Sequence, residues 1–200
     1  MVPAGSGNLV PMRLFAAVLP PEDVTSELAS VVEELRSFPG ADELRWTGRP
    51  GWHFTLAFYG EVDEDVVPEL SAGLERAARR TEPFGLAVRG GGEFGLGRAL
   101  WAGVEDAGAL RVLADRCEEA AREAGVGMRD HRRYRAHLTL ARSREAVDVR
   151  PYLDRLDDFA GRAWTVGELA LVRSNLPRPG VPGEQPRYEA VARWGLGAAG

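Results

Sequence analysis

The tetrapeptide His53-Phe54-Thr55-Leu56 returns later in the chain as His137-Leu138-Thr139-Leu140. An apolar run lies upstream of each copy, at residues 14–18 before the first and at residues 100–104 before the second. Short apolar runs of this kind are typical of strands. Because the surroundings repeat together with the motif, the chain is interpreted as two halves of the same design.

Each half is predicted to run in the order strand, helix, motif strand, helix, strand. Apolar residues at helical spacing predict the helices, with Pro20-Pro21 and Gly125 as ordinary start and stop signals. The predicted helices are residues 22–36, 64–80, 108–124 and 149–159. The other predicted segments are strands at 84–89 and 168–173, a turn at Gly90, Gly91 and Gly92, a proline-rich loop at 176–186 and a closing hairpin strand at 188–194.

Each of the two repeated halves of the chain is too small to bury its own sheet well, so the two halves are expected to pack together. We therefore predict an α+β fold: a bilobal, pseudo-twofold duplication in which two mainly antiparallel sheets face a central cleft, with helices on the outside. One domain is predicted at residues 13–195, between tails at residues 1–12 and 196–200.

Composition narrows the class of protein. The chain has 200 residues, of which 44% are hydrophobic and 28% charged, and no apolar run approaches membrane-spanning length. All 25 basic residues are arginines, which excludes lysine Schiff bases, lysyl-nucleotide intermediates and the P-loop lysine. A single cysteine, Cys117, excludes an internal disulfide. We expect a cytoplasmic monomer that needs no protein partner and has no membrane partner.

The charge is unevenly distributed along the chain. A net charge of −5 argues against indiscriminate binding of nucleic acid. Residues 129–144 break this trend, with six arginines and one acid. Such a segment attracts an anionic ligand. The alternative is a solvated loop whose arginines pair with nearby carboxylates.

The repeated motif carries the residues suited to chemistry. Alternate side chains of a strand face opposite sides, so each motif strand is predicted to have an apolar core face and a polar front face. The predicted front faces are His53, Thr55 and Ala57 in the first copy and His137, Thr139 and Ala141 in the second; the predicted core faces are Phe54, Leu56 and Phe58, and Leu138 and Leu140.

Two of the three histidines lie in the repeat, and the third, His131, is expected to be an exposed loop residue. Near neutral pH a neutral imidazole accepts a proton and a charged one donates it. Hydrolysis of a phosphodiester needs both, because water loses a proton and the departing alkoxide gains one. The hydroxyls of Thr55 and Thr139 are suited to hold the non-bridging phosphate oxygens. This scheme requires no metal and no cofactor.

These paired motifs resemble the two-histidine phosphoesterase superfamily, and their flanks are similar to its bacterial and archaeal RNA 2′,3′-cyclic phosphodiesterases, once called 2′-5′ RNA ligases. The resemblance runs from about Arg13 to Trp194. The flanking stretches that carry it are Arg13-Leu14-Phe15-Ala16-Ala17 with Pro20, Phe58-Tyr59-Gly60-Glu61, Leu100-Trp101-Ala102-Gly103-Val104 and Ala141-Arg142. The chain departs from the family at Gly51, where Asn is frequent, at Ala136, where Pro is frequent, and at Ala16, where a second aromatic residue is frequent.

The resemblance implies a role for each site residue. His53 would give a proton to the leaving ribose oxygen, and His137 would activate water. Thr55 and Thr139 would bind the phosphate. Arg142 matches the family arginine near the phosphate, although strict alternation points it backward, so the strand must end or twist before it. Phe15 and Tyr134 match aromatic positions able to stack on a terminal base, and core packing is equally open for Phe15.

The function predicted from the resemblance is metal-independent hydrolysis of terminal RNA 2′,3′-cyclic phosphates to 2′-phosphomonoesters. The expected partners are RNA 3′ ends that bear a 2′,3′-cyclic phosphate. Two alternatives stay open. The same machinery would also suit a small cyclic nucleotide or an ADP-ribose cyclic phosphate. A module that binds a nucleotide phosphate without turnover is the other alternative.

Overall fold

The computed structural model describes residues 11–127, 134–177 and 184–197. The helices are α1 (Glu22–Leu35), α2 (Val67–Arg79), α3 (Gly108–Glu123) and α4 (Arg150–Asp157), with short 3₁₀ turns η1 (Ala41–Glu43) and η2 (Arg49–Gly51). The strands are β1 (Met12–Val18), β2 (Arg45–Trp46), β3 (Phe54–Val62), β4 (Phe84–Phe94), β5 (Ala99–Val104), β6 (Leu138–Arg142), β7 (Ala160–Val166), β8 (Glu168–Asn175) and β9 (Arg187–Gly195).

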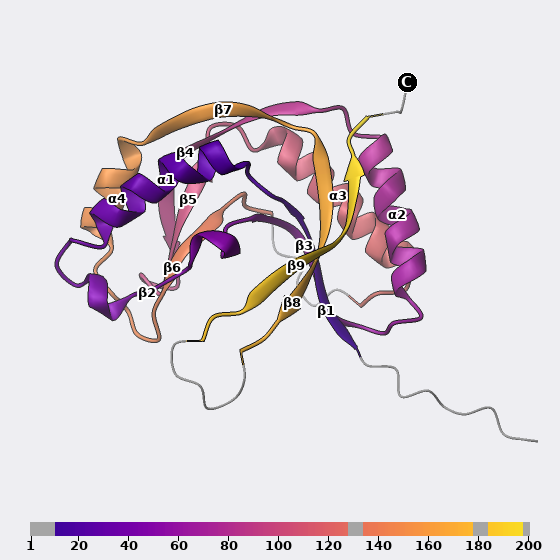
Figure 1. The fold of residues 1–200 in the computed structure, drawn as a ribbon, viewed down its shortest axis with the longest axis horizontal. Coiled ribbons are helices and arrows are strands. Elements are labelled where there is room, and N and C mark those ends of the chain that lie inside the picture. Colours follow the sequence, from indigo (N-terminus) through magenta and orange to yellow (C-terminus); the bar gives the residue numbers. More distant parts are fainter. Residues whose placement is uncertain (1–10, 128–133, 178–183, 198–200) are drawn as a thin grey trace, which may run out of the picture.

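The strands form one nine-stranded sheet in the order β7-β4-β5-β6-β3-β1-β8-β9, with β2 attached to β6 (Figure 1). Each strand pairing is antiparallel. The α+β class is therefore confirmed, but the prediction of two separate sheets is wrong. The reason is that the motif strands β3 and β6 lie side by side and pair at Phe54 and Leu138, which joins the halves into one sheet.

The strand order has a mirrored arrangement about the β3–β6 contact. On one side the order outward is β3-β1-β8-β9, and on the other it is β6-β5-β4-β7. The strand that ends the first half, β4, pairs with β5 of the second half, and β8 of the second half pairs with β1 of the first. Each half thus gives its last repeated strand to the other half.

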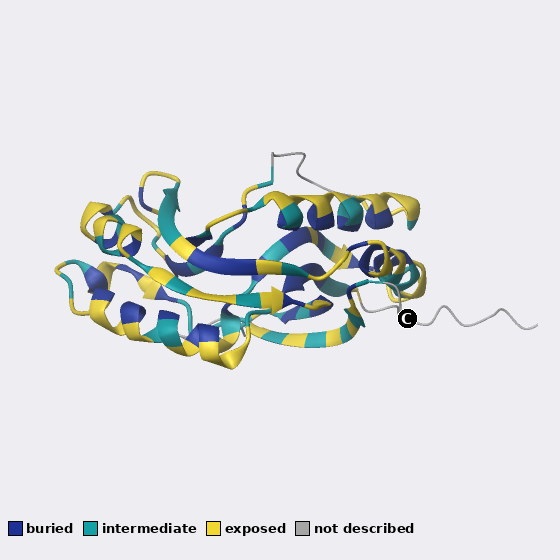
Figure 2. Cartoon of the chain, turned by 90° about the horizontal axis from the view of Figure 1, so that it is seen from above, coloured by how far each residue is buried: buried dark blue, intermediate teal, exposed yellow. Residues whose placement is uncertain are grey.

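The four helices lie in two pairs at opposite sides of the molecule, α1 with α4 and α2 with α3 (Figure 1). Each turns a buried side toward the sheet and an exposed side outward (Figure 2). In α1 the residues buried at helical spacing are Val24, Leu28, Val31, Val32 and Leu35, as the sequence predicts. All four predicted helices are present, with ends that differ from the prediction by zero to three residues.

The predicted turn at Gly90, Gly91 and Gly92 is wrong, because these glycines lie inside β4. The β4–β5 register shifts between Val88 and Gly91, so the chain contains a β-bulge there, with a positive φ of 64° at Gly90. At Gly92 a Cβ atom would overlap the indole of Trp101 on the neighbouring strand. The glycine run therefore makes room for an aromatic side chain within a strand rather than reversing the chain.

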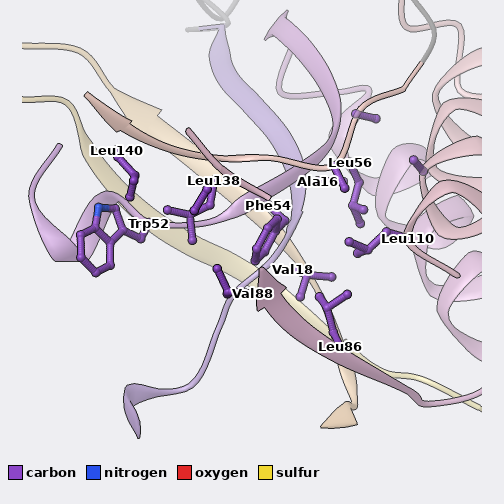
Figure 3. Close-up of a cluster of buried hydrophobic side chains, with 14 of the residues drawn as sticks. Ala16, Val18, Trp52, Phe54, Leu56, Leu86, Val88, Leu110, Leu138 and Leu140 are labelled. Carbon is purple, nitrogen blue, oxygen red and sulfur yellow. The ribbon is translucent and has the colours of Figure 1, made fainter. Parts of the chain in front are cut away.

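The two faces of the sheet bury different clusters. The main core includes Phe54, Leu56, Leu138 and Leu140 together with apolar helix residues, and Figure 3 shows Phe54 and Leu138 close together within it. A smaller cluster lies on the other face of the sheet, called the front face below, and consists of Phe15, Ala17, Ala170 and Val172. The motif strands therefore have an apolar back, and their other face is available for polar side chains.

Candidate active site

The β3–β6 pairing brings the two motifs together. Phe54 pairs with Leu138, and both side chains are fully buried in the main core. Their chain neighbours must face the other way. When this antiparallel register is extended by one residue in each direction, His53 lies opposite Thr139, and His137 lies opposite Thr55. All four of these residues are partly exposed, so two imidazoles and two hydroxyls share the front face.

Each motif strand contains a bulge at its leucine. The β1–β3 register passes over Leu56, and the β5–β6 register passes over Leu140. A bulge re-aims the side chains that follow it. As a result Arg142 is exposed within β6 instead of facing the core. The expected twist before Arg142 is thus a β-bulge.

The same bulges correct the predicted faces of the motif strands. Ala57 and Ala141, predicted on the front, belong to the main core. Phe58, predicted in the core, is 43% exposed, and Tyr59 is buried instead. The hydroxyl of Tyr59 donates to the carbonyl of Cys117 at 3.3 Å. Simple alternation fails because each bulge adds one residue to the strand.

Each histidine ring lies against two aromatic side chains. The His53 ring centroid is 4.7 Å from that of Phe15 and 5.0 Å from that of Tyr188. The His137 ring centroid is 5.0 Å from that of Phe94 and 6.1 Å from that of Trp101. Phe15 and Trp101 hold equivalent positions in the two repeated apolar runs, so the two imidazoles have matching aromatic surroundings.

A backbone carbonyl orients the His137 ring. Nδ1 of His137 lies 2.7 Å from the carbonyl oxygen of Arg135, two residues upstream. A carbonyl only accepts, so Nδ1 carries the proton, and Nε2 of the neutral ring is left as the basic nitrogen. His53 has a backbone hydrogen bond to Gly51, again two residues upstream. The two copies therefore hold their rings in the same way.

The surroundings of the site favour neutral imidazoles. Burial lowers the pKa of His53 from 6.5 to about 4, the Gly51 hydrogen bond opposes this shift, and the charges of His137 and Arg142 add to it. Burial also lowers the pKa of His137, with further lowering by Arg142 and Arg135 against the Arg135 hydrogen bond. Arg142 acts on both imidazoles and His137 acts on His53, so these groups share one electrostatic environment.

Arg142 lies at the edge of a small pocket. Its strand pairs with β2, where Arg45 is the partner of Arg142. Both arginines line a pocket of about 60 Å³ that Tyr188 also lines. The side chain of Gln185 closes one side, because its Oε1 accepts from the Gly48 N–H at 2.8 Å and its Nε2 donates to the Trp46 carbonyl at 2.7 Å. The pocket presents guanidinium groups suited to an anion.

The other predicted site residues have different positions. Phe15 lies beside His53 in the front cluster, away from the main core. Tyr134 packs against the main core, and its buried hydroxyl has no hydrogen-bond partner among the residues that the structure describes. His131 and the arginines at positions 129, 132 and 133 lie outside the described residues.

Sequence reasoning missed Tyr188, Phe94, Trp101 and Arg45 as neighbours of the site. Trp101 had a usable signal, because it occupies the position of Phe15 in the repeated run. The others belong to strands whose partners the sequence did not reveal.

Residues 11–127, 134–177 and 184–197 contain no group of three or more His, Cys, Asp or Glu side chains that would hold a metal ion. Within those same ranges, no helix has the length and apolar character needed to cross a bilayer.

Comparison with known proteins agrees with the resemblance inferred from the motifs. The sequence model of the 2′-5′ RNA ligase superfamily matches residues 20–178. This chain belongs to that superfamily. Among its relatives, the RNA 2′,3′-cyclic phosphodiesterase of Thermus thermophilus is 34% identical over 195 residues, which cover 92% of this chain and 90% of that protein.

This superfamily member is also similar to a Geobacillus protein and to a solved Escherichia coli structure. It is 30% identical over 155 residues to the RNA 2′,3′-cyclic phosphodiesterase of Geobacillus stearothermophilus. The aligned residues make up 76% of this chain but only 47% of the Geobacillus protein, so this chain spans about half the length of that relative. The crystal structure of Escherichia coli LigT complexed with 3′-AMP superimposes with a TM-score of 0.74 at 26% identity and covers 93% of this chain and 98% of LigT.

Proposed function

We propose that this protein hydrolyses terminal 2′,3′-cyclic phosphates of RNA to 2′-phosphomonoesters by paired-histidine acid–base catalysis. One observation carries the proposal: the β3–β6 register puts two imidazoles and two hydroxyls on the same face of one sheet. A site with both a proton acceptor and a proton donor suits a reaction in which water attacks and an alkoxide leaves.

In the proposed reaction the oxygen of water attacks phosphorus while Nε2 of His137 accepts the proton of that water. The bond between phosphorus and O3′ breaks, and His53 gives a proton to O3′. The bond between phosphorus and O2′ remains, which yields the 2′-phosphomonoester. The hydroxyls of Thr55 and Thr139 donate to the non-bridging oxygens, and the Arg142 guanidinium balances the charge that builds on them.

The lowered pKa values fit a site that binds an anion. In the free protein the buried imidazoles are mainly neutral at pH 7, which suits His137 as a base. A bound cyclic phosphate brings a negative charge next to His53. That charge favours the imidazolium and raises its pKa, so substrate binding itself prepares the acid. Side chains supply both proton transfers, and the scheme therefore uses no metal.

The relatives support this substrate class. The Thermus and Geobacillus proteins are named RNA 2′,3′-cyclic phosphodiesterases, and the LigT structure is a complex with 3′-AMP. The aromatic rings beside each histidine, Phe15 and Tyr188 on one side and Phe94 and Trp101 on the other, offer surfaces on which a base stacks.

The test is hydrolysis of a short RNA that ends in a 2′,3′-cyclic phosphate, in the presence of EDTA, with the position of the phosphate in the product determined by NMR. We expect a 2′-phosphate. His53→Ala and His137→Ala should each lower kcat by about 10² to 10⁴. The double variant should lose little more than either single variant, because the two imidazoles act as a unit.

Three results would contradict the proposal: a strict requirement for a divalent ion, a 3′-phosphate product, or additive losses in the double variant. Exclusive turnover of a cyclic mononucleotide or an ADP-ribose cyclic phosphate would move the assignment to a small-molecule phosphodiesterase. Tight binding of RNA with no turnover would identify a binding module.

A further inference from the structure

A wide groove opens in the second half of the sheet next to His137. Its volume is about 850 Å³, and it lies between β4, β5, the start of α3 and residues 134–136. Gly90, Gly91 and Gly103 are also among its lining residues. Its charged lining side chains are Arg89, Arg111, Arg135 and Asp157, and the aromatic side chains of Phe94 and Trp101 lie along it.

The groove is continuous with the candidate active site. Phe94 and Trp101 line it and also contact the His137 ring. The Arg135 guanidinium lies 5.9 Å from the centroid of the Phe94 ring and 5.6 Å from that of Trp101. The Arg135 carbonyl accepts the hydrogen bond that orients His137. A ligand that extends from the reacting phosphate along this side therefore meets aromatic faces and a guanidinium first.

The groove is positively charged although the whole chain has a net charge of −5. Among the described residues that line it, three are arginines and one, Asp157, is a carboxylate. Arg111 and Arg135 have no ion pair within the part of the chain that the structure describes. Arg89 lies 3.5 Å from Glu105, and this pair is solvent-exposed. Exposed guanidinium groups of this kind suit phosphodiester oxygens.

The corresponding surface of the first half differs in character. The equivalent pocket there, at the start of α1 and η2, has a volume of about 700 Å³. Among the described residues that line it, Arg49 and Arg193 are balanced by Glu22 and Glu168. Arg193 is paired with Glu168 at 3.3 Å, and Arg49 donates to the Glu22 carbonyl at 2.8 Å. An RNA chain, with a negative charge on each linkage, therefore fits the groove of the second half better, because arginines outnumber carboxylates there.

We infer that this groove binds the RNA chain on the 5′ side of the terminal cyclic phosphate. The inference rests on the proposed function, and it makes an oligonucleotide rather than a free cyclic nucleotide the preferred substrate. Arg111 and Arg89 contact upstream phosphates, and Arg135 with the Phe94–Trp101 pair supports a nucleotide between these phosphates and the reacting one.

The test compares Arg111→Ala and Arg89→Ala/Arg111→Ala with the wild type and with Arg122→Ala. Arg122 is a matched control, because it is exposed on the same helix, α3, but does not line the groove. One assay measures the Kd of a fluorescein-labelled RNA hexamer with a 3′-phosphate by anisotropy at several salt concentrations. The other measures KM and kcat for 2′,3′-cyclic CMP.

We expect Arg111→Ala to raise the hexamer Kd about threefold to tenfold and to reduce the slope of log K against log salt by about 0.7, the loss of one single-strand phosphate contact. In the double variant the slope should fall by about twice that amount, because two phosphate contacts are lost. KM and kcat for 2′,3′-cyclic CMP should stay unchanged in all variants, and Arg122→Ala should match the wild type in both assays. Thermal unfolding checks that each variant is folded.

The two assays separate failure of this inference from failure of the proposed function. An unchanged hexamer Kd in the double variant, or a wild type that does not bind the hexamer, would overturn the inference and leave the groove to another ligand, such as an acidic protein segment. An equal loss in Arg122→Ala would also overturn it. A wild type that turns over neither substrate would refute the proposed function, while the hexamer Kd would still decide the role of the groove.

Discussion

Replacement of His53 by Gln is expected to make folding less sensitive to acid. The pKa of His53 is about 4 in the folded protein, mainly because of burial, against 6.5 for an unperturbed imidazole. As the pH falls below 6.5, the unfolded chain binds a proton at His53 that the folded chain does not bind until the pH is near 4. Protonation therefore favours the unfolded state, and stability is lost as the pH falls through this window.

The size of the effect follows from the two pKa values. The shift from 6.5 to about 4 corresponds to about 3 kcal/mol over the full window, and about 2 kcal/mol of it lies between pH 7.5 and pH 5. Gln does not titrate. His53→Gln should therefore lose about 2 kcal/mol less than the wild type between these two pH values, while other titrating groups affect both proteins alike.

The assay is urea unfolding at pH 7.5 and pH 5, followed by the fluorescence of the five tryptophans. Thr55→Ser is the matched control, because it changes the same face of the site without removing a titrating group, and it should follow the wild type. If wild type and His53→Gln lose the same free energy of unfolding within about 0.5 kcal/mol, the buried neutral imidazole is the wrong description of His53.

Three further predictions concern other parts of the molecule. Phe54→Ala should lower the free energy of unfolding by about 3–5 kcal/mol, because Phe54 is fully buried where the halves join, and a loss below about 1 kcal/mol in urea unfolding would contradict this. Arg142→Ala should raise the pKa of His53 and of His137, because the charge of Arg142 lowers both, and the two limbs of the pH profile of kcat/KM should therefore move to higher pH. Arg142→Lys should restore the wild-type profile. An unmoved profile in Arg142→Ala would show that the charge of Arg142 does not act on the imidazoles. Tyr134→Phe should keep or raise Tm, because the buried hydroxyl has no partner within the described part of the chain, and a clear fall in Tm would reveal a hidden hydrogen bond.

Much of the fold follows from local patterns in the sequence. The four helices are set by apolar spacing, and β1, β5, β8 and β9 by short apolar runs, so the sequence predicts them. β7 was missed because its residues are mostly exposed or half-exposed at the sheet edge, which leaves little apolar signal. The glycines of β4 were misread because their reason, the indole of Trp101, comes from another strand.

The candidate site was predictable only in part. The four residues His53, Thr55, His137 and Thr139 share one face because strand alternation holds as far as the threonines. After the threonines, the bulges at Leu56 and Leu140 turn the following side chains to the opposite face of the sheet from the one that simple alternation predicts. No local sequence pattern predicts these bulges. The single sheet depends on the long-range pairing of the buried residues Phe54 and Leu138, and the motifs alone do not predict that pairing.

The exchange of β4 and β8 between the halves has a consequence for how such a protein can be assembled. A half-length chain would leave β1 without β8, so it would complete its sheet only in a homodimer with two identical imidazoles. Fusion into one polypeptide removes that symmetry. The second position after each bulged leucine then holds Phe58 in one half and Arg142 in the other, and a donor and an acceptor of protons can diverge from a common ancestor.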